Sequence, residues 1–242
     1  MKINTGTLAV SIAVVIGAYF LSQAIAHRYT SNDVISVTGL GQQDFESDLI
    51  VWGGRFSQTH PELKSAYNLL EKDRKVILQY LTSKGLKAEE IIFSSVDIFN
   101  RTQAKYDNGK YTGEEFVGHE LTQRVQVESK NVSLTETISR EITELINQGI
   151  PFMSDQPEYY YTKLADLKVS LISKATEDAQ VRSQMIAENA QSKLGKLKAA
   201  RMGVFQITGQ NSNEEFSWGG VFNTSSKNKT AVITVKLDYF IK

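Results

Sequence analysis

The chain has 242 residues, with 27 lysines and arginines balanced by 27 aspartates and glutamates. A neutral chain has no electrostatic footprint for nucleic acid, so we expect no nucleic-acid partner. The lack of cysteine in the sequence excludes thiol catalysis, cysteine-based zinc sites and disulfides.

The N-terminal segment is apolar and uncharged from Ile3 to Ala26. We assign residues 1–28 either to a retained transmembrane anchor, which needs about 20 apolar residues, or to a cleaved signal peptide with Ala24-Ile25-Ala26 as its site. A buried core helix is a third interpretation, but this segment lacks a polar face. The first two both export the rest of the chain. We therefore expect a cell-envelope protein with a periplasmic domain, anchored in the inner membrane or released.

The main domain is predicted over residues 34–242, after a polar linker at 29–33. Residues 34–40 alternate as a strand, with Ile35, Val37 and Gly39 on one face. We interpret GQQDFES as a turn and DLIVWGGRFSQ as a second strand.

The Gly39-Leu40-Gly41 sequence raises the question of a phosphate-binding loop. Such a loop needs a strand, a glycine turn and then a helix whose N-terminus binds phosphate. Here a second strand follows, and Asp44 stands where the third glycine belongs. We predict that these glycines shape the approach to a strand connection and bind no cofactor.

Three further helices are expected. The first begins at a Thr59–Glu62 capping box and ends at Gly85, and the second begins at a Ser133–Glu136 box and ends at "NQGI". This pattern indicates two related strand-helix-strand units. The third covers about 164–194, with one face formed by Leu164, Leu167, Leu171, Ala175, Ala179, Ile186 and Ala190.

Long strands fill much of the remaining sequence. Two of them, around an Asp107–Gly109 hairpin turn, lie between the first two helices. The pattern predicts an α+β fold, with a largely antiparallel sheet of about eight strands packed with three helices.

No arrangement of residues specifies a reaction. His27, His60 and His119 lack metal-ligand spacing, and no G-x-S-x-G elbow is present. Glutamate pairs occur at 89–90, 114–115 and 214–215. Such pairs are typical of charged side chains on a solvent-exposed surface. We predict no catalytic, cofactor-binding or metal-binding residues, and a protein that is not an enzyme.

Aromatic residues provide the candidate interaction surface. Tyr159 and Tyr161 share a face of a predicted strand, while Phe216, Trp218 and Phe222 lie in a polar loop. Exposed aromatic residues favour protein interfaces. Packing within the sheet is the alternative role for the tyrosines.

The chain resembles the SIMPL-domain family of bacterial envelope proteins from residue 34 to its end. The stretches ISVTGLGQQDFESDLIVWGGRF, LTSKGLKAEEIIFSSVDI, ATEDAQVRSQMIAENAQSKLG and AVITVKLDYFI carry the resemblance. It implies a SIMPL-like domain that is periplasmic or membrane-associated. In some members it implies a link to oxidative-stress defence and assembly into ring-like oligomers. The family has no established catalytic residues to transfer.

The predicted function is an oligomeric assembly or interaction module without enzymatic activity, with a role in oxidative or envelope stress. A small-ligand-binding protein, or an unrecognised hydrolase with a pocket between sheet and helices, is the alternative. The sequence predicts neither the binding partner nor the number of subunits in the oligomer.

Overall fold

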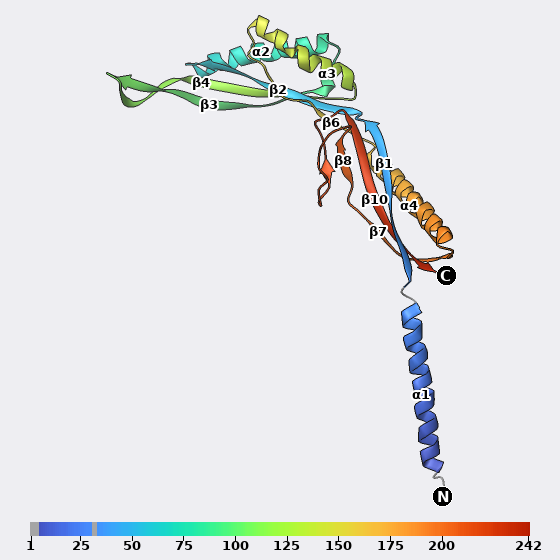
Figure 1. The fold of residues 1–242 in the computed structure, drawn as a ribbon. Helices are drawn as coiled ribbons and strands as arrows, with labels where there is room; N and C mark the ends of the chain where they lie inside the picture. The colour runs from blue at the N-terminus through green and yellow to red at the C-terminus, as the bar shows by residue number, and fades with distance from the viewer. Residues whose placement is uncertain (1–4, 31–32) are drawn as a thin grey trace.

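The computed structural model describes residues 5–30 and 33–242 and consists of one projecting helix and two lobes (Figure 1). Helix α1 (Thr5–Thr30) includes the first two residues of the predicted linker; residues 31–32 lie outside the described part. Large apolar side chains of α1 are exposed, among them Val14, Val15 and Phe20. Within the described residues, no helix has both the length and the apolar character required to cross a membrane.

Sheet A forms the lobe nearer to α1. Its central pair is β1 (Val34–Glu46) and β10 (Asn228–Ile241), which run antiparallel over the whole of β1. Strands β7 (Leu194–Met202) and β8 (Gln206–Gly209) pair with the other edge of β10, and β9 (Val221–Phe222) pairs with β8. Helix α4 (Leu164–Asn189) covers one face of this sheet.

The two glycines of β1 allow α4 to approach the sheet closely. A Cβ atom at Gly39 would lie 2.1 Å from the carbonyl oxygen of Ala175, and one at Gly41 would lie 2.3 Å from that of Leu171. The predicted turn at GQQDFES is therefore wrong, since β1 continues to Glu46 and the glycines serve helix packing. The predicted helix face also shifts: it contains Ser183 and Ala187, and Ile186 is exposed.

Sheet B forms the second lobe. Its strands are β2 (Leu49–His60), β3 (Ile91–Asp107), β4 (Lys110–Ser129), β5 (Met153–Ser154) and β6 (Glu158–Tyr160). Helices α2 (Leu63–Ser83) and α3 (Val132–Glu141) pack on one face, with short 3-10 segments at Ala88–Glu90 and Ile142–Gln148. Large side chains fill the core between them, including Trp52, Phe56, Leu70, Ile77, Leu121 and Val125.

Both predicted capping boxes are wrong, whereas both predicted glycine stops are confirmed. Strand β2 extends to His60, so Thr59 is in the sheet and α2 starts after Glu62. The side chain of Asn131, not Ser133, accepts a hydrogen bond from the backbone N–H of Leu134 (3.2 Å) and caps α3. The stops at residues 85 and 149 have the left-handed backbone that glycine accepts most readily.

The fold class is confirmed as α+β with mostly antiparallel pairing, but the described strands form two sheets rather than one. The sheets meet at Lys229 on β10, which is 1% exposed. Its Nζ donates hydrogen bonds to Ser47 Oγ (3.1 Å), to the carbonyl oxygen of Tyr159 in sheet B (3.0 Å) and to that of Ser226. This side chain therefore joins the turn between β1 and β2 to both lobes.

Candidate functional site

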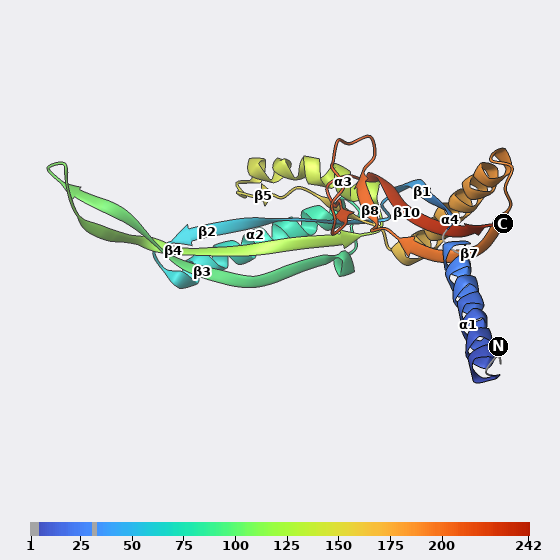
Figure 2. The same ribbon diagram turned by 60° about the horizontal axis from the view of Figure 1, so that its bottom comes forward.

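A long hairpin extends sheet B beyond its helices (Figure 2). Strand β2 supports β4 only as far as the His60–His119 pair. Beyond that pair, residues 101–118 of β3 and β4 form a two-stranded ribbon, which we call the arm. The predicted Asp107–Gly109 turn closes it, with positive φ at Asn108 and Gly109.

Apolar side chains of the arm are exposed to solvent. Tyr106, Tyr111, Phe116 and Val117 have exposed fractions between 40% and 64%. At the base of the arm, Ile98 and Phe99 are also exposed. An isolated two-stranded ribbon is marginally stable in water, and its unpaired edges are templates for pairing with another strand. The arm therefore has the properties of a contact surface.

The second exposed apolar feature is the loop between β8 and β9, which carries Phe216 and Trp218; Phe222, predicted in the same loop, lies in strand β9. Trp218 is 100% exposed, and Phe216 and Phe222 are more than half exposed. Hydrogen bonds nevertheless fix the loop. The side chain of Gln206 donates to the carbonyl oxygen of Ser217 (2.8 Å) and accepts from its N–H (3.3 Å).

The carboxylate of Glu214 further organises this loop. It accepts hydrogen bonds from the backbone N–H of Gly209 (2.9 Å) and from the side-chain amide of Asn223 (2.5 Å). A turn closed by the N–H of Gly220 and the carbonyl oxygen of Ser217 (3.1 Å) places Trp218 at the tip. The indole is thus held in solvent by an ordered loop, which is typical of a contact residue.

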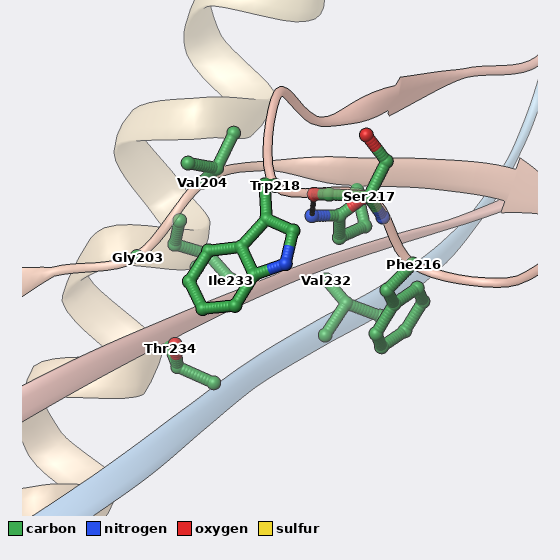
Figure 3. Close-up of a pocket in the computed structure, with 9 residues that line it drawn as sticks. Gly203, Val204, Phe216, Ser217, Trp218, Val232, Ile233 and Thr234 are labelled. Atoms are coloured by element: carbon green, nitrogen blue, oxygen red, sulfur yellow. Dashed lines mark hydrogen bonds between the residues drawn. The ribbon is translucent and has the colours of Figure 1, made fainter.

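An open pocket of about 340 Å³ lies beneath this loop (Figure 3). Its lining includes Val204, Phe216, Trp218, Val232 and Thr234. The pocket is on the face of sheet A away from α4, because Val232 and Thr234 alternate with Ile233, which packs toward the helix. The alternative sequence hypothesis placed a pocket between sheet and helices, which is the opposite side.

A family model described as SIMPL, protein of unknown function (DUF541), matches residues 35–232. The chain belongs to the SIMPL family. The match confirms the resemblance found in the sequence and includes sheet B, the arm, the Trp218 loop and sheet A as far as residue 232 of β10. Comparison with curated proteins gives no match for this SIMPL chain.

The two tyrosines of the predicted surface pack inside the SIMPL domain. Tyr159 is buried, and its hydroxyl donates to Glu136 (3.3 Å). Burial raises the pKa of this hydroxyl, and the nearby Glu136 carboxylate adds to the effect. Tyr161 is half-buried against Phe45, with 4.8 Å between the ring centroids. These positions correspond to the packing alternative. Of the five residues of the predicted surface, the three exposed ones are Phe216, Trp218 and Phe222.

Two histidines that are far apart in sequence come together at the base of the arm. His60 and His119 are paired across β2 and β4, a proximity that sequence spacing does not reveal. His119 Nδ1 is 2.9 Å from Asn100 Oδ1, and His60 Nδ1 accepts from the N–H of Glu62 (3.0 Å). Among the described residues, no group of three or more metal-ligating side chains is assembled.

The glutamate pairs have local structural partners. Glu90 accepts from Ser129 Oγ (2.6 Å), Glu114 accepts from Thr102 Oγ1 (2.8 Å), and Glu115 lies 3.8 Å from Lys105 Nζ. Glu214 organises the Trp218 loop. At least one carboxylate of each pair therefore has a structural role.

Proposed function

We propose that this SIMPL protein is a cell-envelope assembly module without enzymatic activity, and that it binds copies of itself through the arm. The observation that carries this proposal is the exposed two-stranded ribbon at residues 101–118, with apolar side chains and free edges. Covering these side chains in a second copy removes apolar surface from water, which favours association.

The charges of the arm permit contact between identical copies. Arg101, Lys105 and Lys110 are balanced by Asp107, Glu114 and Glu115, so two arms do not repel each other through net charge. Some of these charges are already paired within one copy: Lys105 Nζ lies 3.8 Å from Glu115, and Arg101 lies 2.6 Å from Glu120 just outside the arm. Apolar contact and backbone pairing therefore supply the attraction.

The free edge of β3 supplies a geometry for this contact. Strand β3 is an edge strand of sheet B and pairs only with β4 among the described strands. Two β3 edges can pair antiparallel about a two-fold axis, so that each copy contributes the same surface. Such pairing covers the β3 edge of each arm and leaves the β4 edge beyond His119 free.

The test is the mass of the full chain by light scattering. Assembly through a two-fold β3 contact predicts a particle of at least twice 27.1 kDa. Replacing residues 101–118 by Asn-Gly joins the Asn100–His119 pair through a short turn and removes the arm. We expect this variant to have a lower subunit number than the full chain, with unchanged circular dichroism for the helices.

A matched pair of point variants tests whether assembly depends on the arm or on exposed apolar residues in general. Phe99→Lys places a charge at the base of the arm, and Val181→Lys places one at an exposed apolar position of α4. The first is expected to reduce assembly and the second to leave it intact. A monomeric full chain, or equal loss in both variants, contradicts the proposal.

The location and the stress role belong to the same proposal and rest on the apolar N-terminal segment and the family resemblance. Mass spectrometry of the protein from periplasmic and membrane fractions identifies the mature N-terminus. A terminus at His27 supports signal cleavage, and an intact Met1 or Lys2 terminus in the membrane fraction supports retention. Recovery only from the cytosol contradicts the envelope location. Deleting the gene is expected to increase sensitivity to peroxide or detergent, and unchanged sensitivity contradicts the stress role.

A further inference from the structure

The face of sheet A away from α4 has an apolar half and a cationic half. Along β10, residues Val232, Thr234, Lys236 and Asp238 point to this face because strand side chains alternate. The pocket under Trp218 covers the first two. The last two lie further along the same strand, beside β1 and β7.

The cationic half contains three basic side chains around one carboxylate. Lys236 is paired with Arg201 across β10 and β7, and both are exposed. Asp238 accepts hydrogen bonds from Ser36 Oγ (2.6 Å) and from Arg201 Nη1 (3.1 Å). The Ser36 hydrogen bond lowers the pKa of Asp238, and the cations of Arg201, Lys236 and Lys198 add to this effect.

Two of these positive charges, on Lys198 and Lys236, act on the Asp238 carboxylate only at a distance. Neither Lys198 nor Lys236 forms an ion pair with any residue that the structure describes. The ammonium of Lys198 lies over the ring of Phe240, 5.2 Å from its centroid. The cationic half therefore presents three positive side chains against the one carboxylate of Asp238, although the whole chain is neutral.

The two halves are close enough for one ligand to reach both. Thr234 and Lys236 are two residues apart on a strand, which corresponds to about 7 Å. On β1, Leu40 is paired with Thr234 and Thr38 is paired with Lys236. Leu40 therefore extends the apolar half onto β1, and the hydroxyl of Thr38 lies beside the cationic half. A molecule with an apolar chain and an anionic head matches this arrangement.

We propose that this face binds a single-chain amphiphilic anion, with its apolar chain under Trp218 and its carboxylate or phosphate head at Lys236 and Arg201. The pocket is an open hollow beneath an ordered loop, and it has room for one apolar chain. The volume of about 340 Å³ is within the usual range for small-ligand pockets. This inference concerns a different surface from the arm and does not depend on assembly.

The intrinsic fluorescence of Trp218 provides a local test. The sequence has two tryptophans, and the other, Trp52, is buried in sheet B. Decanoate, kept below its micelle concentration, is titrated into the full chain in detergent-free buffer. We expect a saturable blue shift that the Trp218→Phe variant does not show. Calorimetry of the same titration gives a second readout.

Uncharged decyl maltoside and inorganic phosphate are the matched probes, since each lacks one half of the ligand. Because head and chain both contribute, we expect each to bind at least about tenfold more weakly than decanoate. Equal binding of decyl maltoside overturns the proposal, since the cations then add nothing. A shift with anionic vesicles but not with free decanoate also overturns it in favour of a membrane surface.

Charge variants locate the anionic head. Arg201→Gln with Lys236→Gln is expected to weaken decanoate binding about tenfold. Lys198→Gln is a milder variant that leaves both hydrogen bonds of Asp238 in place. The control is Lys72→Gln with Lys75→Gln on the exposed side of α2, which makes the same change of net charge. Equal weakening in the control, or none in the double variant, refutes the site.

Discussion

The two lobes bury their helices in opposite ways. In sheet A, the glycines of β1 bring the backbone of α4 almost against the strand, and small side chains such as Ala175, Ala179 and Ser183 fill the contact. In sheet B, large side chains such as Trp52 and Leu70 separate the layers and interdigitate. A close backbone contact is sensitive to added atoms, whereas an interdigitated core is sensitive to removed atoms.

The largest expected effect is the loss of a large side chain from sheet B. Trp52→Ala removes a side chain that is 1% exposed, and truncations of this kind cost about 3–5 kcal/mol of unfolding free energy. Trp218→Ala is the matched control, because this indole is fully exposed and the expected change is within about 0.5 kcal/mol. Denaturant titration measures both. Equal losses contradict the assigned core.

The junction between the lobes is expected to show the next largest effect. Burial lowers the pKa of Lys229 from 10.5 to about 8, against a smaller opposing influence of Glu214. Below about pH 8, Lys229 is protonated in both the folded and the unfolded chain. Burial of its charged ammonium then lowers the free energy of unfolding by the full amount. Between about pH 8 and 10.5 the unfolded chain binds more protons, so the free energy of unfolding rises with pH, by about 3 kcal/mol at most.

The variant Lys229→Met isolates this contribution. Other groups titrate in the same range in both proteins, so the informative quantity is the difference between them. We expect the free energy of unfolding of the natural chain to rise relative to that of Lys229→Met as the pH rises from about 7.5 to about 10. A difference that does not vary with pH indicates that the lysine is not held in a desolvated site.

An added methyl group tests the close contact in sheet A. Gly39→Ala places a Cβ atom against the backbone of Ala175 and Ala179 and is expected to cost about 1–3 kcal/mol. Thr38→Ala, on the exposed face of the same strand, is the control. If Gly39→Ala is neutral, α4 moves away from β1 readily and the contrast between the lobes is weaker than the structure indicates.

The smallest expected effect concerns helix capping. Asn131→Ala removes the side-chain cap of α3 in the sheet B lobe and is expected to cost about 1 kcal/mol. Lys163→Ala at the start of α4 removes a side chain that makes no capping hydrogen bond, so we expect little change. Thermal unfolding of both variants measures the contrast, and equal shifts contradict the cap assignment.

Local signals in the sequence predicted local structure well. The glycine stops at residues 85 and 149, the hairpin turn at 107–109 and the alternation of β10 follow from short-range backbone and side-chain preferences. The Thr59–Glu62 capping box was wrong because strand pairing extends β2 over Thr59, and the Ser133–Glu136 box was wrong because Asn131 supplies the cap of α3. The division into two sheets depends on contacts between distant segments.

The burial of Lys229 could have been predicted from the sequence, but it was missed. It shares the strand face of Ala231 and Ile233, so the alternation of β10 already places it inward. The cation cluster on sheet A was not accessible in this way, since Arg201 and Lys236 meet only through strand pairing. The exposure of Trp218 likewise depends on an ordered loop, because polar composition alone does not distinguish a packed tip from an exposed one.

The antiparallel pairing of β1 with β10 also has a consequence for the order of events during synthesis. Sheet B, with its helices, lies within residues 49–160 and is complete long before β10 is made. Strand β1 leaves the ribosome first, but its pairing partner comes last, with about 190 residues between them. The glycine-rich strand therefore stays unpaired while the neighbouring lobe folds, and the C-terminal strand completes the lobe next to α1.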